Sequence, residues 1–232
     1  YLRFYEWNLF GAVREGMATR ADKSQAHVVN CDPKGRRGEI TYPAHGVDLF
    51  ADPGAESVAL TLRVENRTGR DWPREAALIP CLNPGRTPED TPVIPELADS
   101  ERANTYFLGA DGLTTLADGR IHWHADYRGA VAAHRPEGGF PTEGSPWNEE
   151  GEEAATGALL VRESDRGDWV TGVGWEAGLS VDAHNPWQCM HVSVPVGPLA
   201  AGETTEIEGR LYLQRGDRHD VLESYRSEFG TE

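Results

Sequence analysis

The sequence predicts an all-β fold: a large antiparallel β-sandwich with one helix at the C-terminal end. Three observations predict it. Short segments alternate between apolar and polar residues, 26 glycines and 15 prolines separate them, and a single segment near the end has helical spacing. All-β domains of this length are often undivided, so we expect one domain over residues 1–232.

The clearest strand is expected at residues 57–65, SVALTLRVE, where four apolar side chains alternate with Ala, Thr, Arg and Glu. A turn, NRTGRDWP, follows it. Further strands are expected in the segments RFYEW, AHVVN, GEITY, VDLFA, AALIPCL, TYFL, GRIHWH, GALLVRE, DWVTGVGWE, CMHVSVPV and TEIEGRLYLQ.

One helix is expected at residues 217–229. Asp217 is placed to cap its first turn, apolar residues recur at helical spacing, and Gly230 ends it. Two segments, 83–104 and 134–153, show no strand pattern and are predicted to be long loops, which in compact domains are often functional.

Composition excludes several classes of protein. The formal net charge of −16 argues against nucleic-acid binding, which needs a basic face. No run of about 18 apolar residues is present, so no membrane span is expected. Three cysteines without a close pairing pattern predict no disulfide framework, and with no apolar leader segment they favour the cytoplasm.

Histidines recur in two predicted strands. In IHWH, His122 and His124 share one face, and we expect Ile121 and Trp123 to claim the core. In CMHVSVPV, Met190 and the valines are expected in the core, which turns His191 to the other side. If both strands belong to one sheet, their histidines share a polar cleft, with Asp182 and His184 at its mouth.

Such a cleft has three interpretations. A histidine can act as acid or base at neutral pH. His122 and His124 can instead hold a single divalent metal, although Arg128 and Gly129 stand where the cupin pattern needs a glutamate. The third is that these are ordinary strand histidines. A Cys189 nucleophile is disfavoured, because residues i and i+2 of a strand lie about 7 Å apart.

Two tryptophans lie in polar, turn-rich segments: Trp147 in GSPWNEE and Trp187 in HNPWQ. Exposed indoles stack on sugar rings, and Asn185 and Arg128 are candidates for binding hydroxyl or carboxylate groups. The alternative is that both rings plug the ends of the sandwich.

The runs ALTLRVENRTGRDWP and GPLAAGETTEIEGRLYL, with the histidine-bearing strands, resemble carbohydrate-active proteins of the galactose-mutarotase-like (supersandwich) type. The resemblance covers about half of the chain. It implies that a histidine and a carboxylate act on a sugar ring. The histidine would be His122, His124, His184 or His191, and its partner Glu176 or Asp182.

The sequence therefore predicts a carbohydrate-active protein, an isomerase or lyase in which a cleft histidine moves a proton at a sugar ring. Two alternatives stay open. One is a non-catalytic glycan-binding or accessory module of a larger assembly, and the other is an enzyme with a histidine-bound metal.

Overall fold

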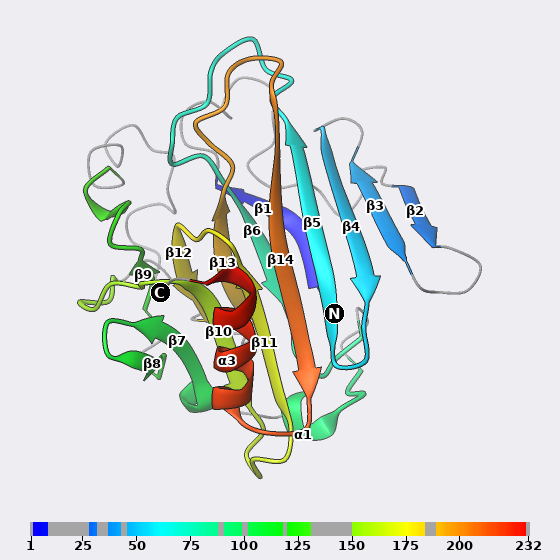
Figure 1. Ribbon diagram of the computed structural model, residues 1–232, viewed down its shortest axis with the longest axis vertical. Helices are drawn as coiled ribbons and strands as arrows, with labels where there is room; N and C mark the ends of the chain where they lie inside the picture. Colours follow the sequence, from blue (N-terminus) through cyan, green and yellow to red (C-terminus); the bar gives the residue numbers. More distant parts are fainter. Residues whose placement is uncertain are drawn as a thin grey trace.

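The protein is a sandwich of two antiparallel sheets with a helix packed on one of them (Figure 1). The computed structural model describes residues 2–8, 28–31, 37–42, 46–87, 91–98, 102–117, 120–130, 150–183 and 189–230. The predicted all-β class and the antiparallel sandwich with one C-terminal helix are confirmed. The single-domain boundary stays a prediction.

The larger sheet has nine strands, in the order β2 (Val28–Cys31), β3 (Gly38–Tyr42), β4 (Val47–Pro53), β5 (Ser57–Glu65), β14 (Thr204–Gln214), β11 (Val170–Trp175), β10 (Ala158–Glu163), β7 (Thr105–Gly109) and β8 (Gly112–Thr115). The smaller sheet has five, in the order β1 (Leu2–Asn8), β6 (Ala77–Leu82), β13 (Met190–Pro195), β12 (Ser180–Asp182) and β9 (His122–Trp123).

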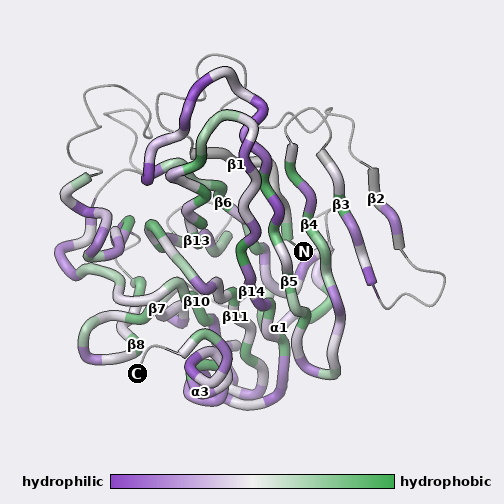
Figure 2. Tube along the Cα trace, turned by 45° about the horizontal axis from the view of Figure 1, so that its top comes forward, coloured by the Kyte–Doolittle hydropathy of each residue, from purple (hydrophilic) through white to green (hydrophobic). Residues whose placement is uncertain are grey.

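The predicted strand at 57–65 is β5, with the expected bounds, and it pairs along its whole length with β14. Leu60, Leu62 and Val64 are buried in the main core, whereas Arg63 on the other face is exposed. Figure 2 shows this alternation of hydrophobic and hydrophilic residues along β5 and β14. A half-buried strand needs this period, because successive side chains point to opposite faces.

Strand β10 is apolar on both faces because it lies between two cores. Leu160 packs into the main core, between the two sheets, whereas Leu159 and Val161 pack into a second core under the C-terminal helix. β10 also contacts β12 and β13 of the smaller sheet. A strand covered on both faces reads as a continuous apolar run, here ALLV.

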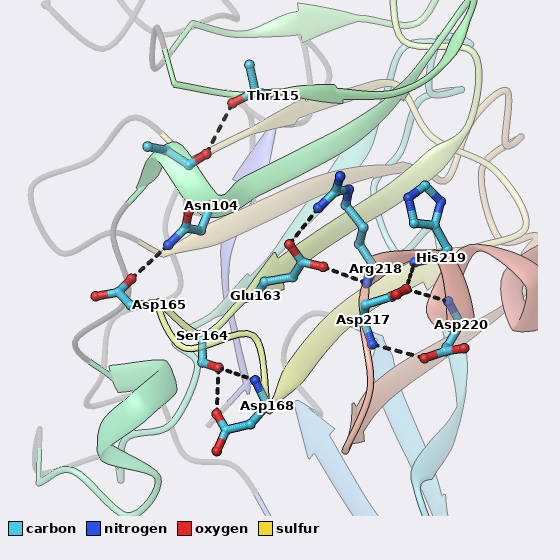
Figure 3. A network of polar contacts seen from close by, with 11 residues as sticks. Asn104, Thr115, Glu163, Ser164, Asp165, Asp168, Asp217, Arg218, His219 and Asp220 are labelled. Carbon is cyan, nitrogen blue, oxygen red and sulfur yellow. Dashed lines mark hydrogen bonds and ion pairs between the residues drawn. The ribbon is translucent and has the colours of Figure 1, made fainter.

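The predicted helix is α3 (Arg218–Phe229), capped by Asp217 in a capping box with Asp220 (Figure 3). Gly230 ends it, with its N–H bonded to the Arg226 carbonyl at 2.9 Å. The Arg218 guanidinium and main-chain N–H both donate to the Glu163 carboxylate at 2.8 Å, which ties the first turn to the end of β10.

The segment predicted as a loop at 83–104 contains two single turns of helix, α1 (Pro95–Ala98) and η3 (Arg102–Asn104). In the described ranges, no helix is both long enough and apolar enough to cross a membrane. Most of the second predicted loop, 134–153, lies outside the described residues.

Candidate functional site

The five-stranded sheet carries polar groups on its outer face, the face turned away from the nine-stranded sheet. Met190, Val192 and Val194 of β13 point into the main core, as the sequence predicts. His191 and Ser193 therefore lie on the outer face, yet both are buried. We call this the outer-face cluster: Cys81, Ser180, Asp182, Cys189, His191 and Ser193.

His191 and Asp182 form the central pair of this cluster. They face each other across the antiparallel pairing of β12 and β13, and His191 Nδ1 lies 2.8 Å from Asp182 Oδ1. The two side chains are only 10% and 8% exposed. A carboxylate can only accept, so Nδ1 carries the proton and Nε2 of the neutral ring is the basic nitrogen.

Beside this pair, the Ser180 hydroxyl donates to the Ser193 hydroxyl at 3.0 Å. These serines are paired two residues further along the same two strands. This bond continues the row of polar side chains that runs across β12 and β13. The row is a direct result of alternation, because both strands place every second residue on the outer face.

Two cysteines complete the cluster. Cys81 of β6 lies opposite His191 in the register of β6 and β13, and Cys189 immediately precedes β13. The hydrogen bond from Cys81 lowers the pKa of the Cys189 thiol to about 5, against the effect of burial, with His191 as a further cause. The side-chain amide of Asn83 lies 3.8 Å from Cys189 Sγ.

Cys189 and His191 come closer to each other than strand spacing predicts. The ligand atoms of Cys81, Cys189 and His191 all lie within 4.8 Å of one another. The expected separation of about 7 Å assumed a regular strand. Cys189 lies before β13 begins, so regular strand spacing does not apply to it.

The expectation that His122 points away from the core is wrong. His122 pairs with Val181, a main-core residue, so it points between the sheets, where its ring centroid lies 4.1 Å from that of Phe107. Its Nδ1 lies 2.8 Å from the Glu153 carbonyl oxygen. Gly151 makes the room, since a Cβ there would lie 2.2 Å from the His122 ring.

Trp123 takes the opposite face, with the outer-face cluster. It packs in a small apolar group with Ile121, Ala77 and Leu179, and its indole N–H donates to the Glu150 carboxylate at 2.9 Å. An indole has an apolar body and one polar donor, so it fits a covered outer face as well as a core. For this reason, hydrophobicity alone could not show which side chains of β9 lie on the core face and which lie on the outer face.

His124 follows β9, and its main-chain N–H donates to the Leu179 carbonyl at 2.9 Å. Its ring packs edge-on against Tyr127, and Nδ1 lies 3.8 Å from an Asp126 carboxylate oxygen. β9 and β13 do belong to one sheet, as expected, with β12 between them. That His124 and His191 share one cleft stays a prediction.

Two other candidates, Arg128 and Glu176, contact residues other than His191. Arg128 donates to the carbonyl oxygens of Gly151 and Glu152. Glu176 follows β11 of the nine-stranded sheet, and its carboxylate accepts from the Glu208 N–H at 3.1 Å. The remaining candidates, His184, Asn185, Trp187 and Trp147, lie outside the described residues.

Metal-binding geometry points to a different place from the predicted one. Within the described ranges, the one group of three ligand-type side chains close enough to share an ion is Cys81, Cys189 and His191. The predicted pair of His122 and His124 is not part of it. Cys81 was not among the predicted site residues, because its neighbours depend on the pairing of β6 with β13, which are more than a hundred residues apart.

Comparison with solved structures finds similarity to a galactose mutarotase-like protein and to two putative aldose 1-epimerases. A putative aldose 1-epimerase from Escherichia coli K12 matches with a TM-score of 0.39 and 10% identity, over 82% of this chain and 65% of that one. A galactose mutarotase-like protein from Lactobacillus casei matches with a TM-score of 0.42 and 10% identity, over 84% and 74%.

A putative aldose 1-epimerase from Klebsiella pneumoniae matches with a TM-score of 0.39 and 11% identity, over 89% of this chain and 54% of that one. The chain thus spans less than two thirds of the length of the first and third of these proteins. No family model and no curated protein sequence matches. At this identity no functional residue is carried over from these structures.

Proposed function

We propose that the protein is a carbohydrate-active enzyme in which His191, oriented by Asp182, transfers a proton at a sugar ring. The observation that supports this is the 2.8 Å contact between His191 Nδ1 and Asp182 Oδ1 on the outer face of the sheet. A buried carboxylate on Nδ1 fixes the ring and its tautomer and stabilises the protonated form. Nε2 is then the atom that takes and returns a proton.

The choice of a sugar rests on the resemblance in sequence to galactose-mutarotase-like proteins. The proposal also sets a requirement. The His191 side chain is 10% exposed, so a substrate must reach a ring that is almost fully buried.

The proposal is tested by nuclear magnetic resonance on a panel of reducing aldoses and uronic acids in D₂O. Exchange between anomers reports proton transfer at oxygen, and deuterium incorporation reports proton abstraction from carbon. We expect catalysed exchange of one of these kinds for at least one sugar. Saturable binding with no exchange would instead support the alternative of a glycan-binding module.

Asp182→Asn tests the orienting role. An amide presents a donor to Nδ1, which favours the wrong tautomer, so we expect turnover to fall by roughly 10²-fold or more. Asp126→Asn is the matched control, because Asp126 lies beside His124 in the other histidine–aspartate pair and is 70% exposed. Loss of turnover in Asp126→Asn but not in Asp182→Asn would assign the chemistry to His124.

A further inference from the structure

The outer-face cluster contains two cysteines that proton transfer by His191 does not use. Cys81 and Cys189 form no disulfide in the structure, both are buried, and each approaches His191. Their sulfur atoms and a His191 ring nitrogen lie within 4.8 Å of one another. Asp182 contacts Nδ1 at 2.8 Å, which makes Nε2 the ring nitrogen expected to serve as a ligand.

These distances suit a bound metal ion. Zinc bonds to sulfur at about 2.3 Å and to imidazole nitrogen at about 2.0–2.1 Å, so tetrahedral ligands lie roughly 3.6–3.8 Å apart. The three atoms lie at most 4.8 Å apart, so each pair would need to approach by no more than about 1 Å to reach this spacing.

The surroundings of the three groups favour a cation. Asp182 on Nδ1 completes the carboxylate–histidine arrangement that orients imidazole ligands in many zinc sites.

We propose that Cys81, Cys189 and His191 bind one thiophilic divalent cation of the zinc class, with the fourth position left for water or another ligand. Two sulfurs and one imidazole are the donor set that zinc prefers, and three protein ligands leave a coordination position open. The inference goes beyond the proposed function and does not rest on it. A cation on Nε2 blocks proton transfer there, so the two uses belong to different states of the protein.

The test is a titration of the metal-free, reduced protein with Co²⁺ in the absence of any sugar. We expect one Co²⁺ per chain, a sulfur-to-cobalt charge-transfer band, the intense visible bands of tetrahedral cobalt, and displacement by Zn²⁺. Cys81→Ser and Cys189→Ser should each lose the charge-transfer intensity of one thiolate and bind weakly. Cys31→Ser is the matched control, since Cys31 belongs to β2 of the other sheet, and it should titrate like the wild type.

Asp182→Asn should weaken metal binding by about 10- to 100-fold without changing the spectrum, the usual effect of losing such a partner. X-ray absorption of the zinc-loaded wild type needs no variant, and we expect two sulfur neighbours and at least one imidazole nitrogen. A wild type without the charge-transfer band, or a zinc shell of only nitrogen and oxygen, would overturn the proposal. Because no sugar is present, either result leaves the proposed function to its own test.

Discussion

Asn66 shows how a single buried side chain organises the turn after β5. It is fully buried, and its amide donates to the carbonyl oxygens of Arg70 and Leu199 at 2.8 and 2.9 Å. Its carbonyl oxygen accepts from the N–H and the hydroxyl of Thr68. The Thr68 hydroxyl also accepts from the indole N–H of buried Trp72. The asparagine thus closes the turn and links it to the loop before β14.

Asn66→Ala is expected to lower the free energy of unfolding by at least about 2 kcal/mol. The reason is that buried polar groups left without a partner cost roughly 1–3 kcal/mol each. Chemical denaturation measures the change. Asn104→Ala is the control, since Asn104 is more exposed and its amide makes one side-chain contact, to Asp165. Equal losses in the two variants would contradict this account of the turn.

The residues of the site were predictable from alternation only in part. Alternation in CMHVSVPV places His191 correctly on the outer face, and Asp182 was already a candidate for its partner. The same reasoning fails for His122 and Trp123, because both side chains are amphipathic and β9 has two residues. In so short a strand, a shift of one residue exchanges the faces with little change in hydrophobicity.

At the scale of elements, α3 packs on the nine-stranded sheet because two glycines of β11 make room for it. A Cβ at Gly174 would lie 2.7 Å from the Tyr225 ring, and one at Gly172 would lie 3.0 Å from Val221. The Tyr225 hydroxyl donates to the Trp175 carbonyl and accepts from the Ala158 N–H, both at 3.0 Å. The glycines that interrupt the strand pattern therefore serve close packing.

Gly174→Ala should push α3 away from the sheet and destabilise the fold by about 1–3 kcal/mol, as overpacking usually does. Gly69→Ala is the matched control, since nothing lies within 4 Å of a Cβ at that position. Thermal unfolding of the two variants and the wild type makes the comparison. If both variants unfold at the wild-type temperature, the contact between α3 and β11 is looser than described.

Alkaline pH should weaken this helix–sheet layer. Burial raises the pKa of Tyr225, and burial together with the charge of Glu228 raises that of Tyr212. A raised pKa in the folded state means that the stability is present in full below pH about 10, the unfolded value, and is lost as pH rises further. An ultraviolet titration should show late-ionising phenols, with one fewer in Tyr225→Phe. If every tyrosine ionised near pH 10, the unfolded value, the predicted alkaline weakening of this layer would be contradicted.

Elements with strong local signals were predictable, and long-range pairing was not. The structure contains the strand predicted from alternating apolar residues, β5, and the helix predicted from its cap and helical spacing, α3. The pairing of β6 with β13 brings Cys81 to His191, and no local pattern encodes it. Register between distant strands depends on the packing of the whole sandwich.

At the scale of the molecule, α3 covers one side of the nine-stranded sheet and the five-stranded sheet covers the other (Figure 1). The outer-face cluster lies beyond the five-stranded sheet, on the side away from α3. This separation allows variants near α3 to serve as controls for variants of the site. His219, exposed in the first turn of α3, is the natural counterpart of His191.

The measurement that tests the central claim most directly is the turnover of His191→Gln relative to His219→Gln, per folded molecule, on the sugar that the wild type accepts. We predict a loss of roughly 10²-fold or more in His191→Gln, the usual size of a general acid–base contribution. His219→Gln should keep wild-type turnover. Equal turnover in the two folded variants would contradict the claim that His191 transfers the proton.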